Sequence, residues 1–148
     1  DSDAVTDGEF EAVARDCRAI CELAAAHGLR VAAECHPNTM TDHYRGALRL
    51  VEAVAHPAFG LYWQPNQLRG AAYDAEAIAA TKPYIQRVHT FFWNAEYEKF
   101  PLAQGEDAWR QYIDLLGDAP TAYLLEFMPQ GTPEELATEA ATLKDWIK

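Results

Sequence analysis

Four residues that can hold a metal ion or move a proton each close a short apolar run. In chain order they are Glu34, Gln64, His89 and Glu126. A parallel strand buried on both faces tolerates a carboxylate only where a partner satisfies it. Neighbouring parallel strands bring their carboxyl ends to one rim of a sheet, where α/β folds place their chemistry. The sequence therefore predicts one polar site built from four strand ends.

The two carboxylates of this set, Glu34 and Glu126, have the chemistry of an acid/base pair. Facing each other across a polyol, one can remove the proton next to a carbonyl and the other can return it. The competing interpretation for both is a buried ion pair with Arg or Lys. His89 is either a metal ligand or a core histidine bonded to a carbonyl. Gln64 is either an amide ligand or a hydrogen-bond donor to substrate.

Strands have to position these residues, and the hydrophobic pattern predicts strands and helices that alternate along the chain. Strands are predicted at residues 29–34, 59–64, 85–89 and 122–126. Helices are predicted at about 8–27, 42–55, 74–81 and 106–116, with a last one opened by residues 132–135. The order α-βα-βα-βα-βα, with helical crossovers, indicates an α/β fold with a parallel sheet.

Strand parity indicates what each face of that sheet carries. Side chains alternate, so Glu34 shares a face with Ala32, and Gln64 shares it with Tyr62. Trp63 falls on the opposite face, where we expect it to pack under helices. A face that is polar at its upper end and small or mixed below is typical of the inside of a closed barrel rather than of an open sheet.

Composition excludes several functions. The chain has 148 residues and a net charge of -11, so it repels nucleic-acid phosphates. No apolar run approaches the ~20 residues of a membrane span. No basic region is followed by an apolar one, so we expect no signal peptide. The odd cysteine count favours a reducing, cytoplasmic location. We expect Cys17 and Cys21 to be core residues and Cys35 to point away from Glu34.

Five motifs, taken in this order and spacing, resemble the C-terminal half of a sugar isomerase/epimerase of the xylose isomerase-like TIM barrel superfamily. They are Glu34-Cys-His36, Val88-His89 and residues 60–67, 101–109 and 124–126. The resemblance covers nearly all of the chain but only about half of the family's domain. It implies that residues 1–148 are a single half-barrel domain made of parallel (βα) units.

The resemblance also implies a divalent metal ion (Mn, Mg, Co or Zn) held by Glu34, His89, Glu126 and Gln64. The two glutamates would then also be the catalytic pair of an isomerase or epimerase that acts on a sugar or sugar derivative through an enediolate. The family has an aspartate where this chain has Gln64. An amide is a neutral, weaker ligand, so we expect the metal to bind weakly or not at all.

Five further residues are predicted substrate contacts for a small sugar or polyol. His36 follows the first strand, Asn66 and Gln67 follow the second, Trp93 lies in a long loop, and Asn38 lies beyond His36. Each also has an ordinary structural interpretation, as a loop-capping histidine, a loop amide or a surface aromatic. Gln67 stands where the family often has histidine.

Three functional hypotheses remain open at this point. The first is a metal-dependent isomerase or epimerase, the second a lyase or dehydratase using the same enolate chemistry, and the third a non-catalytic relative that binds a polyol. The superfamily's endonuclease branch, with its histidine-rich zinc cluster, does not fit the acidic charge. Four parallel strands cannot close a barrel, so we expect a homo-oligomer or another association that completes it.

Overall fold

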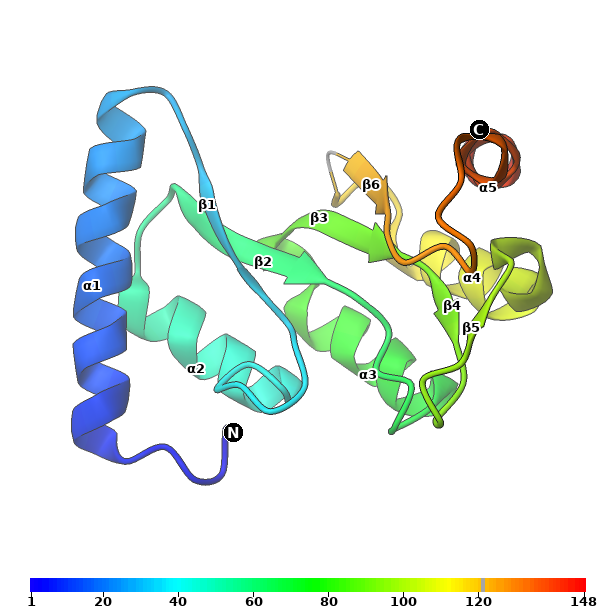
Figure 1. The fold of residues 1–148 in the computed structure, drawn as a ribbon. Coiled ribbons are helices and arrows are strands. Elements are labelled where there is room, and N and C mark those ends of the chain that lie inside the picture. The colour runs from blue at the N-terminus through cyan, green and yellow to red at the C-terminus, as the bar shows by residue number, and fades with distance from the viewer. Residues whose placement is uncertain (121) are drawn as a thin grey trace.

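The computed structural model describes residues 1–120 and 122–148 (Figure 1). Its helices are α1 (Asp7–Ala26), α2 (Tyr44–Val54), α3 (Ala71–Thr81), α4 (Glu106–Leu116) and α5 (Pro133–Trp146), with 3-10 turns η1 (Lys82–Tyr84) and η2 (Leu102–Gly105). Its strands are β1 (Val31–Glu34), β2 (Phe59–Trp63), β3 (Ile85–Thr90), β4 (Phe92–Trp93), β5 (Lys99–Phe100) and β6 (Ala122–Leu125).

The central sheet is parallel, with strand order β1-β2-β3-β6. Strand pairing follows chain order, as expected of successive right-handed βα units. The register sets Glu34 beside Tyr62 and His89 beside Leu124. The predicted fold class, parallel (βα) units in an α/β arrangement, is confirmed.

The sheet has a covered face and an open face. Helices α2, α3 and α4 lie along one side of it, and no helix of the described residues covers the other (Figure 1). Side chains on the covered face, such as Leu61, Trp63 and Val88, are almost fully buried. On the open face Tyr62 is only half-buried and Leu124 is exposed. This asymmetry confirms the parity argument, including the outward position of Trp63.

Two apolar clusters form the core between sheet and helices. One joins α1 and α2 to β1 and β2, and Phe10, Leu50 and Leu61 belong to it. The other joins β3 to α4 and α5 around Trp109, whose indole N–H donates to the Phe91 carbonyl at 2.9 Å. Full burial of one large apolar side chain stabilises the fold by about 1.5–3 kcal/mol. The two clusters therefore hold the helices against one face of the sheet.

Helix caps explain where most helices begin. Thr6 and Glu9 make a reciprocal capping box at α1, and the Thr132 hydroxyl accepts from Glu135 N–H at α5. Helix α2 starts two residues later than predicted because the His43 ring, not Asp42, accepts from the first turn.

Helix α3 begins three residues earlier than predicted, because Gly70, at φ 78°, turns the chain into it. The predicted start, Asp74, instead lies buried within the first turns. Its two oxygens accept from Asn66 N–H at 2.8 Å and from the Tyr112 hydroxyl at 2.9 Å. Burial raises the pKa of Asp74 to about 6. This carboxyl ties the loop that follows β2 to α4.

The long connection after β3 is not the plain loop that the sequence predicted. It folds into a short antiparallel hairpin in which Phe92 pairs with Phe100. Asn94 closes the turn by accepting from the N–H groups of Glu96 and Glu98. Close packing of Phe92 on Gly105 fixes the hairpin against the rim, since a Cβ there would lie 2.4 Å from the Phe92 ring.

The three cysteines are free thiols packed at the first core cluster, as predicted for Cys17 and Cys21. Cys35 packs on the covered side, and burial raises the pKa of its thiol to about 12. A thiol held protonated in this way is no nucleophile. Among the described residues, no helix combines the length and apolarity needed to cross a bilayer.

Candidate active site

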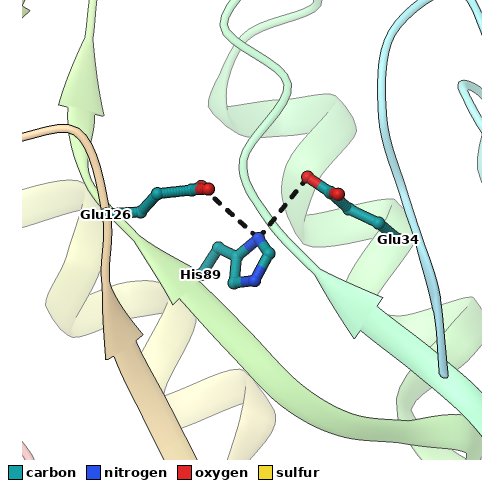
Figure 2. A group of neighbouring side chains, drawn as sticks. All are labelled: Glu34, His89 and Glu126. Carbon is teal, nitrogen blue, oxygen red and sulfur yellow. Dashed lines mark ion pairs between the residues drawn. The ribbon is translucent and has the colours of Figure 1, made fainter. Parts of the chain in front are cut away.

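Three of the four predicted strand-end residues meet at one atom (Figure 2). His89 Nδ1 lies 3.5 Å from Glu34 Oε1 and 3.4 Å from Glu126 Oε2. Glu34 comes from the end of β1, His89 from β3, and Glu126 from the residue directly after β6. The carboxylates therefore reach the central imidazole from opposite sides, across the width of the sheet.

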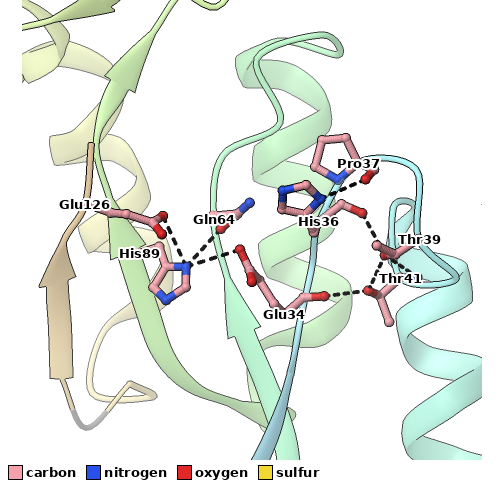
Figure 3. A network of polar contacts seen from close by, with 8 residues as sticks. All are labelled: Glu34, His36, Pro37, Thr39, Thr41, Gln64, His89 and Glu126. Atoms are coloured by element: carbon pink, nitrogen blue, oxygen red, sulfur yellow. Dashed lines mark hydrogen bonds and ion pairs between the residues drawn. The ribbon is translucent and has the colours of Figure 1, made fainter. Parts of the chain in front are cut away.

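The fourth residue, Gln64, completes the group (Figure 3). Its Oε1 lies 3.0 Å from His89 Nδ1, the shortest of the three contacts to that nitrogen, and the residue is only 8 % exposed. The amide oxygen thus points toward the two carboxylates rather than into solvent. All four residues that the sequence placed at one rim lie together there.

Backbone geometry explains this convergence. Glu126 N–H donates to the Thr90 carbonyl at 3.1 Å, so the sheet ladder extends one residue past β6 and holds Glu126 in strand-like register. On the other side, the Thr41 hydroxyl donates to the Glu34 carbonyl at 2.5 Å and contacts Thr39 at 2.9 Å. These bonds anchor the loop after β1, which carries His36 (Figure 3).

The environment of Glu126 is electrostatically unusual. Burial raises the pKa of its carboxyl, the Glu34 charge raises it further, and His89 and His36 oppose the rise. Its side chain is 28 % exposed, against 40 % for Glu34. Glu126 Oε2 is buried and makes no hydrogen bond to the described residues. A buried carboxylate oxygen without a hydrogen-bond donor is suited to bind a cation or a proton.

The donor set fits a divalent metal ion. One ligand atom each from Glu34, His89 and Glu126 lies within 4.8 Å of the others, and Gln64 adds an amide oxygen. A metal bound about 2.0–2.2 Å from N and O ligands spaces neighbouring ligand atoms by roughly 3–3.5 Å. The distances to His89 Nδ1 already lie in that range. Carboxylate, imidazole and amide ligands suit Mn, Mg, Co or Zn.

The predicted substrate contacts divide into two groups. His36 is exposed beside the cluster, its Nδ1 is 2.8 Å from the Pro37 carbonyl, and its charge acts on Glu126. Asn38 and Asn66 instead line a cleft together with Pro37 and Arg69, and Asn66 Oδ1 accepts from Leu68 N–H. The structure therefore gives Asn66 a loop-holding role.

Gln67 and Trp93 line a separate, mostly apolar cavity of about 200 Å³ beside the cluster, together with Phe91 and Tyr112. The Trp93 ring packs on Phe127, with centroids 4.7 Å apart, and its Nε1 is buried without a hydrogen bond in the described chain. Trp93 is thus a packing residue in this structure.

Sequence reasoning missed several residues that shape the site. Tyr62 packs against His89 with ring centroids 4.8 Å apart, and its position two residues before Gln64 is the only signal that marked it. Phe127, directly after Glu126, adopts φ 54°, a conformation that bulky side chains rarely take. Strained backbone next to a functional side chain is a recurrent property of active sites. No sequence pattern indicated it.

Comparison with known proteins places the fold in a family. A solved structure, the probable 3-DHS dehydratase AsbF involved in petrobactin synthesis from Bacillus anthracis, superposes with a TM-score of 0.78 at 24% identity. The match covers 97% of this chain and 59% of that one. A 3-dehydroshikimate dehydratase of Bacillus anthracis is 34% identical over 73 residues, which is 49% of this chain and 26% of the relative.

The chain thus spans little more than half the length of the solved relative that it matches. The sequence model of the xylose isomerase-like TIM barrel family matches residues 2–147. The parallel four-stranded sheet agrees with part of such a barrel, as the sequence predicted. The chain belongs to the xylose isomerase-like TIM barrel family.

Proposed function

We propose that this chain carries the catalytic side of an enzyme that isomerises or epimerises a sugar or sugar derivative. One observation carries the proposal: Glu34 and Glu126 reach the same imidazole nitrogen from opposite sides of an open sheet face. A substrate lying over His89 would have one carboxylate on each side. That placement allows removal of a proton next to a carbonyl and its return at a neighbouring position.

The two carboxylates would have unequal roles. Glu126 has the raised pKa and is the more buried, so it is the stronger base and would remove the substrate proton. Glu34, more exposed at the other side, would pass a proton from solvent water to the product. Tyr62, whose ring packs on the imidazole, would hold His89 in orientation. His36 would contact a substrate hydroxyl or carbonyl.

A divalent metal ion is part of the proposal, and its ligands would be Glu34, His89, Glu126 and Gln64. When bound, such an ion polarises a substrate carbonyl and stabilises the negative charge of an enediolate. Binding at His89 Nδ1 requires that this nitrogen carry no proton. With Gln64 in place of a carboxylate, we expect weaker binding than a site with three acidic ligands would give.

A dehydratase is the second candidate, because the curated relative and the solved structure that are similar to this chain are both described as 3-dehydroshikimate dehydratases of Bacillus anthracis. Removal of a proton next to a carbonyl is also the first step of a β-elimination. The same base, Glu126, would serve, and Glu34 would then protonate the departing hydroxyl. The two candidates differ in the fate of the enolate rather than in how it forms.

Deuterium exchange tests the common step and separates the candidates. We expect the Mn-loaded protein in D2O to place deuterium next to the carbonyl of one member of a panel of ketoses and keto-polyol acids, as read by NMR. An isomerase gives a product that carries a new C–D bond, whereas a dehydratase gives an unsaturated product and water. If the assembled, metal-loaded protein binds a polyol but exchanges no deuterium into it, the protein is better explained as a non-catalytic relative that binds polyols.

We further propose that residues 1–148 act as one half-barrel domain that associates to close the barrel. Strands β1 and β6 each leave one edge unpaired within the described sheet, and the open face carries the exposed Leu124. A second copy could supply the missing strands. Sedimentation equilibrium should give a dimer at micromolar concentration; a monomer would contradict this. The three free cysteines favour a cytoplasmic location.

A further inference from the structure

A cleft with about 460 Å³ of space lies near the start of α2, apart from the Glu34–His89–Glu126 cluster. Three of the eight arginines of the chain line it, namely Arg45, Arg49 and Arg69. His43 and Asp3 are also part of its wall. Three guanidinium groups around one cleft are unexpected in a chain of net charge -11, which has 23 Asp and Glu residues against 12 Lys and Arg residues.

Two of these guanidinium groups have no anionic partner. Arg49 is neutralised by Asp7, with Nη2 2.7 Å from Oδ1. Arg45 and Arg69 make no ion pair and donate no side-chain hydrogen bond within the part of the chain that the structure describes. Their five N–H donors each are therefore available to a ligand.

Aromatic rings nevertheless hold both guanidinium groups in place. Arg45 lies 5.7 Å from the Tyr44 ring centroid, and Arg69 lies 5.1 Å from that of Tyr73. The two tyrosine rings are 5.8 Å apart, and Tyr44 N–H donates to the Tyr73 hydroxyl at 3.0 Å. One aromatic cluster thus carries both cations. It also includes His43, whose ring is 4.6 Å from Tyr44 and 5.3 Å from Tyr73.

The local field is positive despite the acidic chain. Burial lowers the pKa of His43, and Arg69 and Arg45 lower it further by more than Asp3 and Asp42 raise it. Asp42 is already engaged, because the Ser2 hydroxyl donates to its Oδ1 at 2.6 Å. Asp3 is the remaining carboxylate in the wall. The two free arginines therefore outweigh it.

We propose that this cleft binds the phosphate group of a small phosphorylated compound, with Arg45 and Arg69 as its main contacts. Planar guanidinium forks match phosphate oxygens in pairs, and two of them lie beside one aromatic cluster in the wall of the same cleft. The cleft lies on the same rim as the strand ends, because Arg69 belongs to the loop after β2 and also lines the cleft beside Pro37. The proposal does not depend on the function proposed above.

Calorimetric titration with inorganic phosphate, in chloride buffer of constant ionic strength, tests this site. We expect saturable binding by the unmodified chain, and at least about tenfold weaker binding by Arg45→Gln and by Arg69→Gln. Arg110→Gln is the matched control, since Arg110 lies on α4 and pairs with Glu106. It should bind phosphate like the parent. Thermal unfolding of each variant shows whether it is folded.

Two results would overturn the proposal. One is phosphate affinity that is equal in all four folded proteins, or no binding above that of chloride. The other is a changed sedimentation coefficient in Arg45→Gln and Arg69→Gln with unchanged phosphate affinity. That outcome would assign the cleft to contact with an acidic surface of a second copy.

Discussion

Glu126→Gln should lower the rate of substrate proton exchange by about 10²–10⁴-fold, because it removes the general base. The substitution keeps the size of the side chain and retains an oxygen that can still face His89. Glutamine cannot accept the proton, so exchange should fall even when Mn²⁺ saturates the variant. Deuterium incorporation in D2O, followed by NMR on the metal-loaded protein, measures the effect.

Glu11→Gln is the matched control, because Glu11 is an exposed carboxylate on α1 that is not part of the Glu34–His89–Glu126 group. It should exchange at the parental rate. Equal rates in Glu126→Gln and Glu11→Gln would remove Glu126 from the chemistry. In the metal-free protein, Glu126 should take up its proton at a higher pH than an ordinary glutamate does, because burial raises the pKa of its carboxyl. An NMR titration of the metal-free protein measures this.

Gln64→Asp should tighten binding of Mn²⁺ by at least about tenfold, or about 1.4 kcal/mol. The change brings a third carboxylate to the strand end that faces His89, whose Nδ1 lies 3.0 Å from the Gln64 oxygen. A carboxylate adds a formal charge to a ligand position that the amide fills only with a dipole. Fluorescence or calorimetric titration with Mn²⁺ measures the difference in dissociation constant.

Gln67→Asp separates ligation from added charge. Gln67 is three residues away and lines the neighbouring apolar cavity rather than the cluster. A carboxylate there adds the same net charge, so it should alter Mn²⁺ affinity much less than Gln64→Asp does. If both variants bind Mn²⁺ equally, the gain comes from general charge and Gln64 is not at a ligand position.

The rim could be predicted from sequence because strand ends and parity are local properties. An apolar run ending in Glu34, His89 or Glu126 fixes both the face and the end of the sheet that these side chains occupy, once the strands are parallel. The positions of Gln64 and Trp63 follow from alternation alone, since neighbouring residues of a strand point to opposite faces.

The contacts that cross between distant segments could not be predicted in this way. Asp74 marked the predicted start of a helix, yet its carboxyl accepts hydrogen bonds from Asn66 and from Tyr112. Tyr112 lies 38 residues after Asp74. Burial of Trp93 against Phe127 likewise depends on a hairpin whose strands are two residues long. Elements this short carry no periodicity, so only tertiary packing determines them.

Stoichiometric metal binding tests the central claim most directly, namely that Glu34, Gln64, His89 and Glu126 form one metal site. Calorimetric titration of the metal-free protein with Mn²⁺ should give one ion per chain, and His89→Ala should weaken binding by at least about tenfold, since it removes the central ligand. His56→Ala is the control, because the His56 ring only accepts from Ala58 N–H in the turn before β2. Equal Mn²⁺ affinity in His89→Ala and His56→Ala, or no Mn²⁺ binding by the folded unmodified protein, would contradict the account.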